Sequence, residues 1–207
     1  MKKKTMLRDL ILPNKKINFF IITVMLLGIL SGSIFLMMLS DSDKSSVVLQ
    51  IQTFFQNIHQ GNIDNGLALK NSLVINYLFI GIIWVLGFSM IGIFINIFLT
   101  YIKGFLVGFS ISSIFLTFGY KGIPASLLYS LLSQILNIII VVVLSIYSIM
   151  FSFHLVKIIT SKKGNNKLML RKYFTIFMIS IMISFVSSLL EVYLFPNVLK
   201  IMIHLYI

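Results

Sequence analysis

Few residues in this chain have the types and spacing that enzymes use. The 207 residues include five Asp and Glu, three His and no Cys. Without cysteine the chain has no disulfide framework and no thiolate nucleophile. His59, His154 and His204 are far apart, and the sequence contains neither an H-E-x-x-H pair nor a phosphate-binding glycine loop with its lysine. We therefore expect a protein that is not an enzyme and that uses no cofactor or metal.

Glu191 is the only acid inside a long apolar run. A carboxylate in the membrane is costly unless it is paired, protonated or close to the surface. Lys121 falls near the same expected membrane face and is a candidate partner. Glu191 then either makes a structural hydrogen bond that fixes the last helix, or it contacts a partner or a polar cavity. A lone carboxylate lacks the second titrating group that acid–base catalysis uses.

Two further sets of residues are spaced for contacts between helices. Gln134 and Asn137 share a helix face and can hydrogen-bond to other helices. Glycines four residues apart let helix backbones approach closely, within one chain or in a dimer. The glycine pairs are Gly28 with Gly32 and Gly104 with Gly108. We expect packing within one chain, and a homo-oligomer remains the alternative.

These residues must be positioned by membrane helices. Hydrophobic residues make up 58% of the chain and charged residues 11%, which is more apolar surface than a soluble domain of this size can bury. The apolar runs are continuous rather than alternating, so helices are expected instead of barrel strands. The five runs cover 18–39, 73–100, 102–118, 125–159 and 173–195. The expected fold class is an all-α polytopic membrane protein with five transmembrane helices.

The fourth run is too long for one simple span. Its residues, about 35 in number, would form a helix of ~52 Å, whereas the hydrocarbon core is ~30 Å thick. Polar residues cluster early in this run, at Ser133, Gln134 and Asn137. We therefore expect 124–136 to lie in the interface or to re-enter, and 137–158 to cross the membrane.

The basic residues indicate the orientation, because cytoplasmic segments are enriched in Lys and Arg. With the N-terminus inside, thirteen of the 17 Lys and Arg residues fall on the cytoplasmic side, and Lys103, near the start of the third run, is counted among them. Lys44, Lys70, Lys121 and Lys200 remain outside. We expect a cytoplasmic N-terminus and an external C-terminus. The net charge of +12 then serves topology and contact with membrane lipid, so no nucleic-acid partner is expected.

The longest external loop contains an amphipathic helix pattern. Apolar residues from Val47 to Ile58 recur at helical spacing and form one face. Ser45 or Ser46 is expected to cap the start of the helix, and Gly61 to end it. The opposite face is polar and carries no cation: Gln50, Thr53, Gln56, Asn57 and Gln60. The helix either lies on the membrane or bundle surface, or it docks an extracytoplasmic partner through its polar face.

The expected organisation has five parts. They are a basic cytoplasmic N-terminus, a first span, an outer loop with the amphipathic helix, a four-span bundle and an outer tail. In order, the boundaries are 1–16, 17–39, 40–72, 73–195 and 196–207. The tail is a second short amphipathic piece on the outer side.

The stretch 82–122 carries a family resemblance. Its elements are Trp84-Val85-Leu86-Gly87, Gly92, Lys103-Gly104-Phe105, Gly108-Phe109 and Gly119-Tyr120-Lys121-Gly122. The pattern continues elsewhere with Gly28, Gly32, Gln134, Phe151-Ser152-Phe153 and Glu191-x-Tyr193-x-x-Pro196. In this order and spacing the elements resemble the stage II sporulation protein M family over nearly the whole chain. The chain departs from the family pattern at Phe94 and Ser133, where the family has proline, and both changes let helices continue.

The resemblance implies a role rather than a reaction. It implies a scaffold that anchors sporulation proteins D and P, the peptidoglycan-degrading enzymes outside the membrane. Their complex thins the septal wall and drives engulfment of the forespore. The resemblance also implies a multi-pass protein of the mother-cell septal membrane, with 41–72 and the tail as the docking segments.

Two other function classes compete with this interpretation. A permease subunit working with a separate ATPase would need a cytoplasmic coupling element, and the inner loop 157–172 is short and basic. A channel or proton relay would need a chain of polar groups through the bilayer, for which Glu191 alone is thin support.

Overall fold

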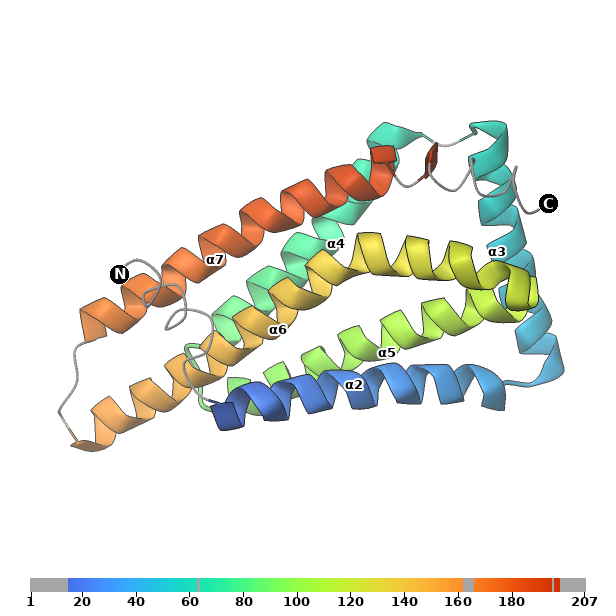
Figure 1. Cartoon of the computed structure of the whole chain (residues 1–207). Helices are drawn as coiled ribbons and strands as arrows, with labels where there is room; N and C mark the ends of the chain where they lie inside the picture. Colours follow the sequence, from blue (N-terminus) through green and yellow to red (C-terminus); the bar gives the residue numbers. More distant parts are fainter. Residues whose placement is uncertain (1–14, 63, 162–165, 195, 198–207) are drawn as a thin grey trace, which may run out of the picture.

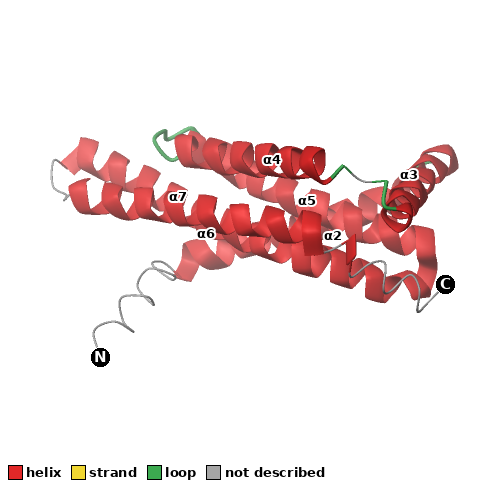
Figure 2. Ribbon diagram, turned by 90° about the horizontal axis from the view of Figure 1, so that it is seen from above, coloured by secondary structure: helices red, strands yellow, loops and turns green. Residues whose placement is uncertain are grey.

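The computed structural model describes residues 15–62, 64–161, 166–194 and 196–197, without the side chains of residues 59, 121–133, 159–161 and 166. Every regular element in these ranges is helical (Figure 2). The elements are α2 Lys15–Met38, α3 Asp41–Gln60, α4 Asn65–Leu86, α5 Gly92–Phe118, the 3-10 helix η1 Gly119–Gly122, α6 Ile123–Ser161, α7 Asn166–Leu189 and the π-helical turn η2 Leu190–Leu194.

Five of the helices are long and apolar enough to cross a membrane. In the described residues these spans are Lys15–Met38, Asn65–Leu86, Gly92–Phe118, Gln134–Ile158 and Lys167–Leu194. They run lengthwise through the bundle, and α3 lies across one end of it (Figure 1). We call this the α3 end. The prediction of an all-α membrane protein with five transmembrane helices is therefore confirmed, and the direction of the termini remains a prediction from charge.

The predicted boundary between the second and third spans is wrong. The second span was expected to begin at residue 73 and to end near residue 100. Instead α4 begins at Asn65, because Asp64 caps it and accepts hydrogen bonds from the backbone N–H groups of Gly66 and Leu67, at 2.9 and 3.1 Å. The turn falls at 87–91, and Lys103, which was counted on the cytoplasmic face, lies within α5. The outer loop is correspondingly shorter than 40–72.

Side chains of other helices satisfy the end of α4. The last carbonyl groups of a helix have no partner within that helix, and in lipid they must find one elsewhere. Ser148 donates to the carbonyl oxygen of Ile83 at 2.9 Å, and Tyr173 donates to that of Trp84 at 2.7 Å. Ser152 donates to the carbonyl oxygen of residue 87 at 2.8 Å. These bonds from α6 and α7 explain how the chain can turn at residues 87–91.

The spanning part of the fourth run lies close to the expected 137–158, and the position of 124–136 relative to the membrane remains a prediction. Helix α6 is continuous from Ile123 to Ser161, and the part that meets the criteria for a span is Gln134–Ile158. The only proline in this helix is Pro124, at its second position, where proline costs no helix hydrogen bond. Residue 133, where the family pattern has proline, is serine in this chain and does not interrupt the helix.

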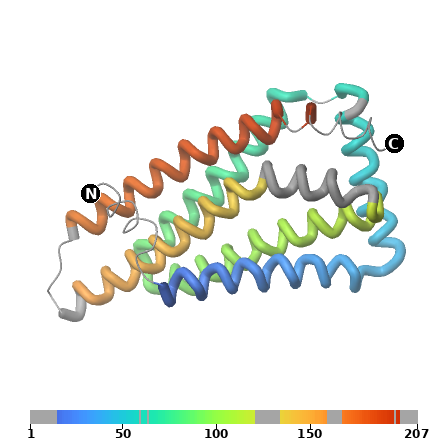
Figure 3. The backbone as a smooth tube through the Cα atoms, in the orientation of Figure 1, coloured from blue at the N-terminus to red at the C-terminus, as the bar shows by residue number. Residues whose placement is uncertain are grey.

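Helices α2 and α5 run side by side (Figure 3) and pack through glycine. A Cβ atom added at any of four glycines would collide with a backbone carbonyl oxygen of the other helix. These glycines are Gly28 and Gly32 of α2 and Gly104 and Gly108 of α5. The backbones are therefore in direct contact within one chain, which is the geometry that small residues four apart allow.

A second core joins α4, α6 and α7. Ile83, Leu144 and Tyr173 are almost fully buried within it. Trp84 stacks on Phe177 with ring centroids 4.5 Å apart. Large apolar side chains on the outer surfaces of the spanning helices are exposed, as expected for surfaces that face lipid.

Candidate functional site

The helix α3 is the first candidate site, and its ends are well defined. Its N-cap is Ser40, whose hydroxyl accepts a hydrogen bond from the backbone N–H of Asp43 at 3.3 Å and donates to the Asp43 carboxylate at 2.6 Å. The expected cap at Ser45 or Ser46 is wrong, because the cap lies five or six residues earlier, at Ser40. The expected end at Gly61 is confirmed. Its backbone has φ 75°, a left-handed conformation that favours glycine.

The apolar face of α3 packs against the end of α5. Phe55 and Ile58 are buried against Ile114. The rings of Phe55 and Phe118 lie edge to face, with centroids 4.9 Å apart. The helical spacing of the apolar residues therefore predicted which face of α3 packs against the bundle. These contacts with α5 hold α3 in place at this end.

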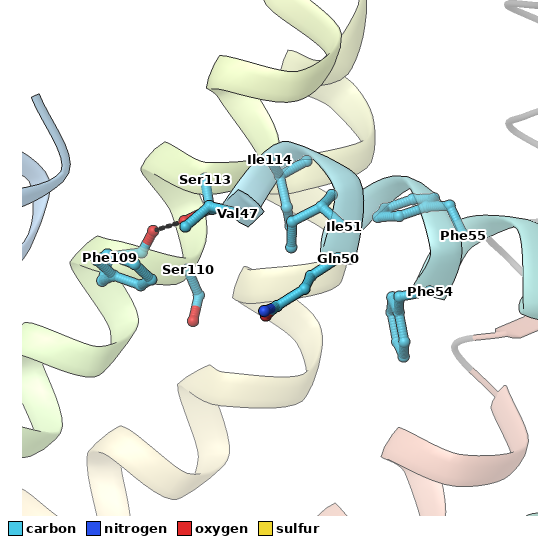
Figure 4. A pocket seen from close by; sticks show the side chains of 9 residues that line it. All are labelled: Val47, Gln50, Ile51, Phe54, Phe55, Phe109, Ser110, Ser113 and Ile114. Atoms are coloured by element: carbon cyan, nitrogen blue, oxygen red, sulfur yellow. Dashed lines mark hydrogen bonds between the residues drawn. The ribbon is translucent and has the colours of Figure 1, made fainter. Parts of the chain in front are cut away.

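The polar face of α3 is open. All five predicted docking residues are exposed: Gln50, Thr53, Gln56, Asn57 and Gln60. The hydroxyl of Thr53 donates to the carbonyl oxygen of Leu49 in its own helix, so the exposed polar groups of this face are mainly amides. Gln50 differs from the other four, because its side chain lines a groove between α3 and α5 (Figure 4).

This α3–α5 groove has a volume of about 240 Å³. The side chains that line it from α3 include Val47, Ile51 and Phe54, and those from α5 include Phe109 (Figure 4). Two serines of α5 also line it, but their hydroxyls donate to backbone carbonyl groups one turn earlier in α5, at 2.7 and 2.8 Å. The groove is therefore mostly apolar.

A polar cluster inside the membrane region is the second candidate site. The Glu191 carboxylate accepts a hydrogen bond from Ser72 at 2.7 Å. The Ser72 and Ser188 hydroxyls are 3.0 Å apart, and the Asn76 amide donates to both of them, at 3.2 Å to Ser188 and 3.3 Å to Ser72. The cluster joins α4 to the end of α7. Glu191 itself lies in η2, and π-helical turns of this kind occur often at functional sites.

The expected partner of Glu191 was Lys121, whose side chain lies outside the described residues. The described partner is Ser72. A second charge near the cluster is Lys103, which is only 9% exposed and has its Nζ 5.7 Å from the centre of the Phe79 ring. Glu191 attracts the Lys103 ammonium electrostatically. The two groups are not a direct ion pair in the part of the chain that the structure describes.

Lys103 is the site residue that the sequence reasoning missed. A signal for it was present, since Asn96, Thr100 and Lys103 recur at helical spacing on one face of α5. All three are buried. Thr100 bonds to Ser145 of α6 at 2.9 Å, so this face points into the bundle. A polar stripe of this kind marks the inward face of a membrane helix.

The other predicted polar pair is less connected. Asn137 is buried and Gln134 is half-buried. Within the described ranges neither side chain makes a hydrogen bond to another helix. The described residues also contain no group of three or more His, Cys, Asp or Glu that could hold a metal ion.

Most of the chain matches a known protein family. A family model described as Stage II sporulation protein M matches residues 21–196. The chain belongs to the stage II sporulation protein M family. The matched range contains most of the first span and all of the other four, together with α3, the glycine contacts and the Glu191 cluster. No curated protein and no solved structure matches the chain. The family assignment makes this a multi-pass membrane protein of sporulation, as the resemblance predicted.

Proposed function

We propose that this chain is a non-catalytic membrane scaffold. It recruits extracytoplasmic peptidoglycan-degrading enzymes, sporulation proteins D and P, and holds them at the septum. There the enzymes thin the septal wall during engulfment of the forespore. The chain acts from the mother-cell septal membrane. Family membership supports the link to sporulation and to the membrane.

The observation that carries the proposal is the geometry of α3. This helix lies across the end of the bundle that the charge distribution assigns to the outside (Figure 1). Phe55 and Ile58 fix it, so a partner does not have to order it on binding, which removes one entropic cost of association. Its polar face offers uncharged hydrogen-bonding groups, which favour a protein partner over an anionic lipid surface.

The chemistry of the interior supports a role without catalysis. The Glu191 carboxylate is engaged by Ser72, and the nearby polar groups come from α4 and α7 within the spans. A peptidoglycan hydrolase of the usual glycosidase kind places two carboxyl groups beside its substrate in water. Glu191 has no second carboxyl group beside it in the described cluster.

The test replaces the open polar face with alanine, which preserves the helix. The variant carries Thr53→Ala, Gln56→Ala, Asn57→Ala and Gln60→Ala. Both proteins are purified from sporulating cells in mild detergent, and partners are quantified by mass spectrometry. We expect recovery of the hydrolases to fall about tenfold or more, because several central contacts are lost together. A matched control, Ser89→Ala with Met90→Ala, changes exposed residues in the turn at the opposite end.

The control should recover the hydrolases as the unchanged protein does. Equal recovery with the alanine variant would show that the docking surface is not on α3. If the unchanged protein brings down a cytoplasmic ATPase and no hydrolase, the scaffold proposal fails and the permease alternative takes its place.

A further inference from the structure

The interior of the bundle contains polar groups beyond the Glu191 cluster. Asn96, Thr100 and Lys103 share one face of α5, and all three are buried. Ser184 lies about one turn before Ser188 on α7 and is also fully buried. Neither the amide of Asn96 nor the hydroxyl of Ser184 has a hydrogen-bond partner in the described part of the chain. Because an unpaired polar group is costly in lipid, these groups favour a polar ligand inside the bundle.

Lys103 adds a charge to these groups. An ammonium group only donates hydrogen bonds, and that of Lys103 donates none to an acceptor among the described residues. Glu191, which attracts it, is half-buried, whereas every other charged residue of the described spans is exposed. Lysine differs from arginine in that it can release its proton inside a protein. The charged groups inside the described spans are therefore one lysine and one carboxylate, and both can exchange a proton.

The polar groups between these two charges follow one another along the bundle. Glu191 accepts a hydrogen bond from Ser72, and the amide of Asn76, about one turn farther along α4, donates to the Ser72 hydroxyl at 3.3 Å. Phe79 follows Asn76 on the same face of α4, and the centre of its ring lies 5.7 Å from the Lys103 Nζ. Lys103 is therefore the next polar group after Asn76 on the way inward from the α3 end.

The series continues from Lys103 toward the opposite end of the bundle. Thr100 lies about one turn before Lys103 on α5, and its hydroxyl oxygen is 2.9 Å from that of Ser145. Asn96 comes about one turn before Thr100, and α5 begins about one further turn away at Gly92, at the end opposite α3 (Figure 1). Polar groups therefore extend from the α3 end almost to the other end of the spans. We call this series the polar column: Glu191, Ser72, Asn76, Lys103, Thr100 and Asn96.

Water is the ligand that the polar column suits. A buried water molecule bonds to several polar groups at once and bridges groups that are too far apart for a direct bond. The column presents both donors and acceptors, since it combines an ammonium, amides, hydroxyls and a carboxylate. The charge of Lys103 disfavours a metal cation in the same place. Chains of polar and titrating groups through a membrane are typical of proton relays, and Glu191 alone would not make such a chain.

We propose that the polar column binds a row of water molecules and carries protons between the two ends of the bundle. The Lys103 ammonium releases a proton into the water near Asn96. The amine that remains takes up a proton from Glu191 through the water and hydroxyl groups between them, and Glu191 regains a proton from the water at the α3 end. Each proton that enters at one end is matched by one that leaves at the other, so no reactant is consumed. This activity belongs to the interior of the chain and does not depend on the proposed partners.

The test measures proton flux through the purified full-length protein. The protein is reconstituted into phospholipid vesicles that contain a pH-sensitive dye, and potassium with valinomycin removes the membrane potential. After acid is added outside, the internal pH should fall at least about tenfold faster than in vesicles without protein, since a positioned proton-transfer group accelerates its step by a factor of about 10²–10⁴. An equal rate in the two kinds of vesicle would overturn the proposal.

The variant Asn96→Leu separates a proton path from a structural role. The Asn96 amide has no partner among the described residues, so its removal should not lower the stability of the protein against unfolding. It should still slow acidification about tenfold, because an apolar side chain then interrupts the column near one end. Glu191→Gln removes the titrating group at the other end and should slow acidification by a similar factor. Unchanged proton flux in either variant would contradict the proposed path.

A matched pair of threonines controls for a general loosening of the bundle. Thr100 and Thr117 both lie on α5, and the hydroxyl of each donates to the carbonyl oxygen of the residue four positions earlier, at 2.9 Å. Only Thr100 belongs to the polar column. Thr100→Val should therefore slow acidification, and Thr117→Val should leave it at the rate of the unchanged protein. If both variants slowed it equally, or if neither did, the proposal would be wrong.

Discussion

Two interfaces within this bundle hold membrane helices together in different ways. Helices α2 and α5 meet through glycine, and their backbones are in direct contact. Helices α4 and α7 share an apolar core and meet in addition through hydrogen bonds among Ser72, Asn76, Ser188 and Glu191, with Lys103 nearby. Lipid supplies no hydrophobic drive for helices to associate, so close packing and polar bonding are the two means available.

The two interfaces suit different structural roles. A glycine contact has one well-defined geometry, because any added atom collides with backbone. A polar cluster can exchange partners among several donors and acceptors. The α2–α5 pair is therefore suited to a rigid support beneath α3, and the α4–α7 pair is the part of the bundle that can adjust. The predictions below test this contrast.

The largest effect is expected at the glycine contact. Gly32→Leu would force a side chain into the backbone of α5, where a Cβ alone already collides with the carbonyl group of Phe105. We expect a loss of about 3 kcal/mol or more, measured by unfolding in detergent and denaturant, because backbone cannot move aside cheaply. The matched control is Gly81→Leu on α4, where a Cβ meets nothing within 4 Å.

The control protein should unfold like the unchanged chain. If Gly32→Leu did so too, or if both variants lost the same stability, the α2–α5 contact would not be the rigid interface described.

The next effect concerns the two buried charges. We expect Glu191→Gln to destabilise the protein, because the Lys103 ammonium then lacks the opposing charge of Glu191. In a double-mutant cycle with Lys103→Met, the double variant should be about 1–2 kcal/mol more stable than the sum of the single changes predicts. The same unfolding measurement gives all four values. Strict additivity would mean that the two charges do not interact and that the cluster is held by neutral bonds alone.

The smallest effect is expected for one neutral bond of the cluster. Ser188→Ala removes a hydroxyl that joins α7 to Ser72 and Asn76 of α4, and it should cost about 0.6 kcal/mol, an average value for such bonds in membranes. Ser180→Ala is the control on the same helix. Its hydroxyl donates to the carbonyl oxygen of Ile176 in α7 itself.

The Ser180 variant should lose little stability, because no contact between helices is removed. A larger loss at Ser180 than at Ser188 would contradict the view that polar bonds join α4 to α7.

Much of the fold was predictable from patterns along the chain. Continuous apolar runs predicted membrane helices, since a backbone in lipid must pair its own polar groups. The spacing of apolar residues in the outer loop predicted which face of α3 is buried, and Phe55 and Ile58 lie on it. Such properties depend on local sequence and solvent, so they need no knowledge of neighbouring helices.

The sequence-based predictions were wrong where contacts with other helices determine the local structure. Lys103 was counted on the cytoplasmic face, where basic residues are usual, rather than inside the bundle. In the fold, Phe79 of α4 lies against its Nζ and Glu191 lies near enough to attract it, so α5 continues through this position. The end of α4 at Leu86 likewise depends on Ser148, supplied by α6.

By itself, then, the sequence determined that this protein lies in a membrane, that it is helical, how many spans it has and where its amphipathic surface helix lies. These follow from hydropathy and from the 3.6-residue period, which act along one chain segment at a time. Only the tertiary structure decided where the second span ends, which glycines face each other and how a lysine can lie inside a membrane bundle. Each of these depends on atoms brought together from helices that are distant in the sequence.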